Sequence, residues 1–134
     1  MITSKVNYLG KLRTQAVHER SKQEYISDAP IDNNGKGEAF SPTDLVSTAL
    51  CSCMMTLMGM LADRENIDLA GMSASVTKIM KADPRRISEV IIHFDMTTVQ
   101  ATINQRTKLE RAALTCPVAM SLSKELKQTV HFNY

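Results

Sequence analysis

Residues 41–62 read SPTDLVSTALCSCMMTLMGMLA, and this stretch decides how the rest of the chain is arranged. Ser41 suits a helix N-cap, Pro42 suits the first helical position, and Asp44 stands where a capping-box acid is found. None of residues 45–62 is charged, and a run of this length could cross a lipid bilayer. Scattered Ser, Thr and Gly residues and charged flanks instead favour a buried helix of a soluble protein.

A helix without a charged face needs cover on nearly all sides. The chain has 134 residues, which is enough for one domain, 1–134, with a modest hydrophobic core. One small domain offers only a single sheet as cover. We therefore expect a homodimer that has the helix of residues 41–62 at its centre.

Hydrophobic periodicity and turn residues predict an α+β fold around this helix. Val90, Ile92, Phe94 and Met96 alternate with more polar residues, as on the buried face of an antiparallel hairpin. Pro117 suits the first position of a further helical segment. The expected strands are residues 2–9, 12–18, 23–27, 72–80, 87–96 and 128–132, and the expected helices are residues 41–62, 102–114 and 117–126.

Composition narrows the possible partners and the compartment. The net charge is +2 without a Lys/Arg cluster, which argues against nucleic acid as a partner. The N-terminal residues show no apolar run with a cleavage site, so we expect a cytoplasmic protein without a membrane segment. Three cysteines are an odd number, which fits a reducing compartment better than a secreted disulfide framework.

Two cysteines far apart in sequence could meet in the fold. Cys116 precedes Pro117 at a predicted helix N-terminus, where free amides favour a thiolate. Cys53 lies about 18 Å from the start of its helix at 1.5 Å per residue, so it would need a cation from elsewhere. Cys51 points about 200° away from Cys53 on a helix of 3.6 residues per turn, and the two cannot share a target. Buried cysteines also serve as small hydrophobic residues, and spacing alone does not choose between these roles.

Two segments carry a resemblance to a known family. The run from Ser41 to Cys53, together with LERAALTCPVAM at residues 109–120, resembles the OsmC/Ohr family of organic hydroperoxide reductases and osmotically inducible proteins. Pro42, Cys53 and the pair Cys116-Pro117 match that family in identity and spacing. The resemblance extends over essentially the whole chain and implies an OsmC-like α+β fold, in which antiparallel sheets surround a long central helix in an intertwined homodimer.

The same resemblance implies a thiol-dependent peroxidase. Cys53 would be the peroxidatic thiol that attacks an organic hydroperoxide, and Cys116 the resolving thiol that turns the sulfenic acid into a disulfide. An external dithiol of the lipoyl type would then reduce the disulfide. No bound cofactor and no metal are implied. Cys51 stands where the family usually has Ala or Gly, so we expect it to serve in packing.

One position departs from the family pattern. The family's hydroperoxide reductases carry a Glu directly after the helix-opening Pro, where it holds an Arg near the peroxidatic thiolate, and this chain has Thr43. Asp44 or Glu38 could substitute for that acid. Arg13 is the best candidate for the arginine, and Arg20 is the next.

Alternatives of other classes remain open. The fold could serve a non-catalytic stress-response protein or a binding protein for small apolar ligands, with inert cysteines. Met54, Met55, Met58 and Met60 suggest a copper(I) site beside the cysteines, but they point around the whole helix and therefore favour core packing. The three histidines, His18, His93 and His131, have no metal-ligand spacing in the sequence.

Overall fold

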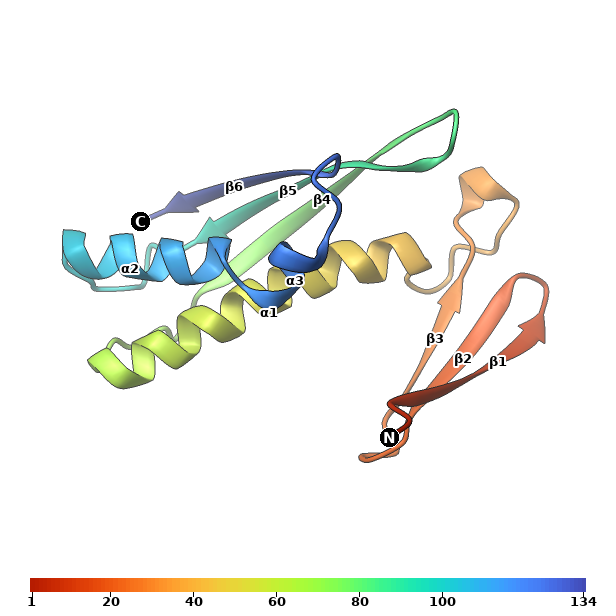
Figure 1. Cartoon of the computed structure of the whole chain (residues 1–134), viewed down its shortest axis with the longest axis horizontal. Helices are drawn as coiled ribbons and strands as arrows, with labels where there is room; N and C mark the ends of the chain where they lie inside the picture. Colours follow the sequence, from red (N-terminus) through yellow and green to blue (C-terminus); the bar gives the residue numbers. More distant parts are fainter. The chain divides into compact units, whose positions relative to one another are not determined.

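The computed structural model describes residues 1–134 and confirms the α+β class, with two three-stranded sheets and one long helix (Figure 1). Main-chain contacts divide the chain into two compact units, Met1–Val46 and Ser47–Tyr134. Each unit is described by itself below.

The first unit is an antiparallel sheet with the strand order β1-β2-β3. Its strands are β1 (Ser4–Gly10), β2 (Arg13–His18) and β3 (Glu24–Asp28), and a 3-10 turn, η1 (Ile31–Asn33), follows them. In register across the sheet lie Val6, Ala16 and Tyr25, with Tyr8 on the same face. Val6, Tyr8 and Tyr25 are 60%, 67% and 46% exposed, whereas Ala16 between them is buried, so the large apolar side chains of this face lack cover within the first unit.

Helix α1 (Pro42–Glu65) begins where its sequence predicts. The amide of Asp44 donates to Ser41 Oγ at 3.1 Å, and the amide of Ser41 donates to Asp44 Oδ2 at 3.0 Å. This reciprocal pair is the predicted capping box, which satisfies two amides that helix geometry leaves without partners.

α1 is long and apolar enough to cross a membrane by length and composition, a test that the core helix of a soluble protein also passes. Leu50, Met54 and Met58 are fully buried in the core of the second unit. Only 33% of the helix's most apolar window is buried within one chain. Much of α1 therefore remains without cover from its own chain.

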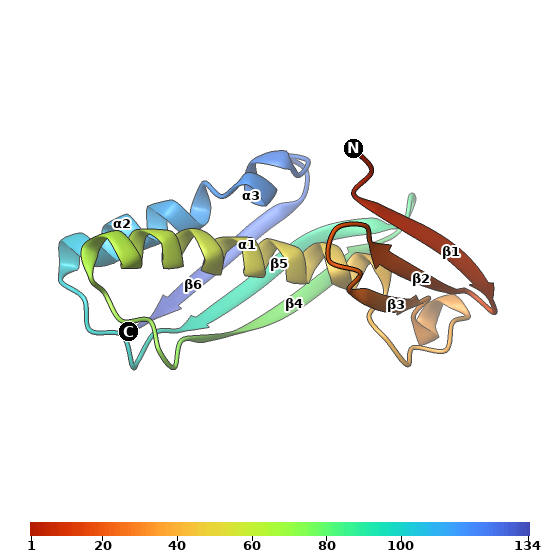
Figure 2. The ribbon, with the colours of Figure 1, turned by 90° about the horizontal axis from the view of Figure 1, so that it is seen from below.

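The second unit has the strand order β4-β5-β6. Its strands are β4 (Ser73–Lys81), β5 (Arg86–Asp95) and β6 (Lys127–Asn133), and α1 and α2 (Ile103–Leu114) lie on one face of this sheet (Figures 1 and 2). The predicted face of β5 is confirmed, because Val90, Ile92 and Phe94 are at most 1% exposed and belong to the same core as α1. β5 and β6 run parallel, an arrangement that needs a long crossover, here supplied by α2 and by a further helix, α3 (Pro117–Ser121).

The third helix is shorter than expected. α3 (Pro117–Ser121) stops five residues before the predicted end at residue 126. Leu122 already has extended backbone angles, φ −79° and ψ 153°, and Ser121 Oγ donates to the carbonyl of Pro117 at 2.7 Å. Such a side-chain bond to the preceding turn weakens a helix, and a five-residue helix has little else to sustain it.

Candidate active site

The structure brings Cys53 and Cys116 together within the second unit. Cys53 lies on α1 and is partly exposed, and Cys116 is the N-cap of α3 and is fully buried. The two side chains are close enough to interact, because Cys53 is among the groups that raise the pKa of the Cys116 thiol, and both are free thiols. The fold therefore brings near each other the two thiols that the resemblance paired.

The electrostatic expectation for Cys116 was wrong. Its sulfur accepts a hydrogen bond from the amide of Ala119 at 3.4 Å, as expected at a helix N-terminus. Burial nevertheless raises the pKa of the Cys116 thiol, and the amide bonds from Ala119 and Val118 only partly oppose this rise. The neighbouring Cys53 raises the pKa of Cys116 further. The amide bonds do not outweigh burial, so Cys116 remains a protonated thiol.

Cys51 lies on the core side of α1. It is only 6% exposed and belongs to the hydrophobic cluster of the second unit, and burial raises its pKa. A buried, protonated thiol behaves as a small apolar side chain. This placement agrees with the packing role expected for Cys51.

Arg13 lies at the centre of an ionic cluster in the first unit. Its Nε and Nη2 donate to the two carboxylate oxygens of Asp28 at 2.7 and 2.8 Å, and Nη2 also donates to Glu38 Oε2 at 3.0 Å. Asp28 is held further by the amide of Glu38, which donates to its Oδ2 at 3.2 Å. Such fork-to-fork bonds fix the plane of a guanidinium. The cluster leaves Nη1 of Arg13 without an acceptor in the chain.

Of the two acids proposed to hold Arg13, only Glu38 is bonded to it. Asp44 is bonded in the capping box of α1, and the hydroxyl of Thr43 lies 3.3 Å from Ser41 Oγ in the same cap. Arg20 is exposed in the turn after β2. The principal partner, Asp28, was missed from the sequence, although a pairing of residues 12–18 with residues 23–27 continued by one residue would have placed it opposite Arg13.

The Arg13–Asp28 pair predicts a pH dependence of stability. The Arg13 hydrogen bonds lower the pKa of the Asp28 carboxyl from its usual 3.8, so folding favours the ionised form. A carboxyl with a lowered folded pKa contributes stability that is present above the unfolded pKa and is lost as the pH falls through the folded pKa. We expect Arg13→Gln to lower the melting temperature at pH 7, and the difference from wild type to shrink below about pH 4.

Thermal unfolding followed by circular dichroism at several pH values measures this difference. Arg20→Gln removes an exposed arginine of the same unit that has no bonded acid, and it serves as the control with little effect at any pH. A melting-temperature difference for Arg13→Gln that is the same at pH 7 and pH 3 would contradict the prediction.

Comparisons with known proteins show the family to which the chain is related. The sequence model of the family described as OsmC-like protein matches residues 35–131. A Psychrobacter arcticus crystal structure, provisionally named as an osmotic stress induced and detoxification response protein, is 50% identical, with a TM-score of 0.94 over 99% of this chain and 96% of that one. No curated protein matches.

More distant structures share the fold alone. The organic hydroperoxide resistance protein OsmC of Legionella pneumophila is 15% identical, with a TM-score of 0.73 over 100% of this chain and 98% of that one. An organic hydroperoxide resistance protein of Elizabethkingia anophelis, with thiocyanate bound, is 12% identical, with a TM-score of 0.71 over 99% and 96% of the two chains. The match over residues 35–131 covers most of the sequence, and the chain belongs to the OsmC-like family.

Proposed function

We propose that this protein is a thiol-dependent peroxidase that reduces organic hydroperoxides. The observation that supports the proposal most strongly is the proximity of partly exposed Cys53 to buried Cys116, whose pKa Cys53 raises. A sulfenic acid formed on Cys53 would have a second thiol already within reach. Both cysteines lie on regular elements of one unit, so their encounter needs no large rearrangement.

The proposed cycle has three balanced steps. The Cys53 thiolate attacks the distal oxygen of the hydroperoxide and the O–O bond breaks, which gives a sulfenic acid on Cys53 and an alkoxide that takes a proton from water and leaves as the alcohol. The Cys116 thiol attacks the Cys53 sulfur, and the sulfenic oxygen leaves as water, which gives the disulfide. An external dithiol of the lipoyl type then reduces this disulfide by exchange and is itself oxidised.

Burial distinguishes the roles of the two thiols. Cys116 has no exposed surface, whereas Cys53 is accessible in part. A hydroperoxide from solvent can therefore reach Cys53 but not Cys116. The raised pKa of Cys116 keeps that thiol protonated and unreactive toward peroxide. Cys116 is therefore suited to resolve a sulfenic acid rather than to form one.

Arg13 is proposed to supply the cation that Cys53 needs, as the family resemblance implies. Its guanidinium is held by Asp28 and Glu38, which take over the holding role of the family Glu that Thr43 replaces. The free Nη1 is the group available to a thiolate or to a peroxide oxygen. Arg13→Gln removes both the charge and the guanidinium fork, so it should lower the rate of peroxide reduction by the folded protein, and an unchanged rate would remove Arg13 from the mechanism.

We also propose that the chain acts as a homodimer. The support comes from two surfaces that one chain leaves uncovered, which are the apolar face of β1–β3 and the greater part of α1. Monomeric soluble proteins seldom expose apolar patches of this kind. Sedimentation equilibrium should give twice the chain mass of 14.9 kDa, and a single-chain mass at micromolar concentration would contradict the proposal.

The decisive experiment maps disulfides after one reaction. Reduced protein is treated with one equivalent of cumene hydroperoxide, quenched with acid, alkylated and digested, and its disulfides are identified by mass spectrometry. We expect one link, between Cys53 and Cys116, and release of one equivalent of cumyl alcohol. Unchanged thiols together with unconsumed peroxide would favour the non-catalytic binding protein instead.

A further inference from the structure

The outer face of the β4–β6 sheet carries a pair of histidines that the peroxidase cycle does not use. On β5, Ile92 and Phe94 point into the core, so His93 and Asp95 point to the opposite, exposed face. The parallel register places His93 directly opposite His131 of β6. Their rings stack with centroids 4.5 Å apart and an interplanar angle of 12°.

The histidine nitrogens are available to a ligand. Both side chains are exposed, and neither imidazole forms a hydrogen bond with any other group of the chain. His18, in contrast, has its Nδ1 bonded to Ser21 Oγ at 2.6 Å. Two imidazoles side by side without partners offer lone pairs on neighbouring strands, and imidazole is the commonest protein ligand of transition metals.

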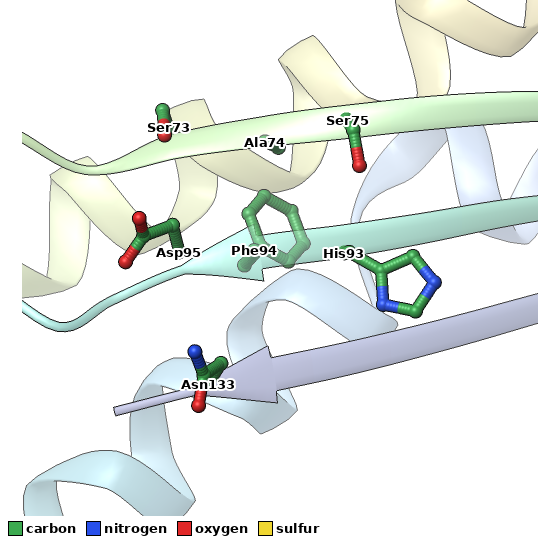
Figure 3. Close-up of a pocket in the computed structure, with 7 residues that line it drawn as sticks. All are labelled: Ser73, Ala74, Ser75, His93, Phe94, Asp95 and Asn133. Atoms are coloured by element: carbon green, nitrogen blue, oxygen red, sulfur yellow. The ribbon is translucent and has the colours of Figure 1, made fainter.

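The histidine pair lies beside a shallow pocket that several polar side chains line. Next to His93 lies a shallow pocket of about 480 Å³ that is lined by side chains of β4, β5 and β6 (Figure 3). Asp95 places a carboxylate there, and its Oδ1 accepts hydrogen bonds from the hydroxyl and the amide of Thr97. Asp95 Oδ2 remains without a partner, and Asn133 lies across from Asp95 on β6. The pocket therefore combines negative charge with space for bound water.

We propose that His93 and His131 bind a divalent late first-row transition-metal ion, such as Ni²⁺ or Zn²⁺, on this outer face. An imidazole nitrogen binds such an ion at about 2.0–2.1 Å, so two nitrogens on one ion lie at most about 4.2 Å apart. In the stacked arrangement the ring planes are nearly parallel, so both side chains must leave the stack and turn about their own bonds until a nitrogen lone pair of each points at the same ion. No group of three or more His, Cys, Asp or Glu side chains gathers around a common point, so water completes the coordination.

Asp95 contributes charge rather than a bond to the ion. It lies two residues along β5 from His93, a spacing of about 6.6 Å along a strand. Its carboxylate attracts a divalent cation into the pocket and can accept hydrogen bonds from water on the ion. The site is independent of the thiol pair, because its residues lie on the face of the sheet opposite the core.

Titration of untagged protein with NiCl₂ tests the site. The protein carries Cys53→Ser, so that the remaining thiols, Cys51 and Cys116, are buried and do not compete. Isothermal titration calorimetry should give one Ni²⁺ per chain. Paramagnetic Ni²⁺ should broaden the ring proton signals of His93 and His131 together at substoichiometric metal and leave those of His18 sharp.

Substitutions separate a chelate from scattered binding. Loss of a group that only hydrogen-bonds to a metal ligand typically weakens metal binding about 10–100-fold, and loss of a ligand itself should cost at least as much. His93→Ala and His131→Ala should therefore each weaken Ni²⁺ binding at least about tenfold. Asp95→Asn should weaken it less, and His18→Ala should leave it unchanged. All four positions are exposed, and circular dichroism checks that the variants fold.

Two results would overturn the proposal. One is Ni²⁺ binding of equal strength in wild type, His93→Ala and His131→Ala, which would show that the stacked rings serve only in packing. The other is a loss shared equally by His18→Ala, which would show separate weak binding to single histidines. Neither result tests the proposed peroxidase activity, which is measured in separate experiments.

Discussion

Cys53→Ser is expected to abolish the reduction of organic hydroperoxides. A serine hydroxyl is not ionised at neutral pH and does not accept a peroxide oxygen as a thiolate does. Loss of a nucleophile removes the chemical step itself, so the rate should fall by about 10³-fold or more, to that of peroxide with free dithiol. Consumption of cumene hydroperoxide with dihydrolipoamide as reductant measures the effect.

Cys51→Ser is the matched control, because it makes the same change two positions earlier on α1. Cys51 is buried in the core, so its replacement should cost some stability while the rate of the folded protein stays near wild type. If Cys53→Ser retains peroxidase activity and Cys51→Ser loses it, the two cysteines have been given the wrong roles. If both variants keep the wild-type rate, the thiols of α1 are not needed for catalysis.

Cys116→Ser is expected to separate the first chemical step from turnover. Serine is a good N-cap and can accept the Ala119 amide in place of the sulfur, so α3 should persist. Cys53 should still react with the first equivalent of peroxide, but its sulfenic acid then has no thiol partner in the chain. Steady-state turnover should fall by about 10²-fold or more, and excess peroxide should carry Cys53 on to the sulfinic acid.

A sulfenic-acid probe such as dimedone detects the intermediate. Cys116→Ser treated with one equivalent of peroxide should gain one dimedone adduct on Cys53, whereas wild type should gain little because its disulfide forms first. Normal turnover of Cys116→Ser at limiting dithiol would show that Cys116 does not resolve the intermediate.

The start of α1 and the buried face of β5 could be predicted from the sequence because both depend on neighbouring residues. The cap uses Ser41 and Asp44, three positions apart, and a strand alternates between two faces by geometry alone. The pairing of Cys53 with Cys116 came from a family resemblance. Spacing could not supply it, because the two residues meet only through the packing of α3 against α1.

The remaining features depend on groups distant in sequence. Asp28 holds Arg13 because antiparallel pairing places the two opposite each other, and His93 meets His131 through the parallel pairing of β5 with β6. Cys116 was expected to be a thiolate because the sequence around it, with Pro117 next, predicts the start of a helix. Neither the burial of its sulfur nor the approach of Cys53 could be seen there, and these two facts reverse the direction of its pKa shift.

In the proposed cycle, the enclosure of Cys116 also decides how the disulfide can be reduced. A dithiol arriving from solvent reaches the Cys53 sulfur of the disulfide first, so the mixed disulfide must form on Cys53, and Cys116 must depart as the leaving group. Thiols with a high pKa leave slowly in such exchanges, and the pKa of Cys116 is raised. In the proposed cycle, departure of Cys116 therefore controls the return to the reduced state, and a reductant that delivers a proton to its sulfur has the advantage.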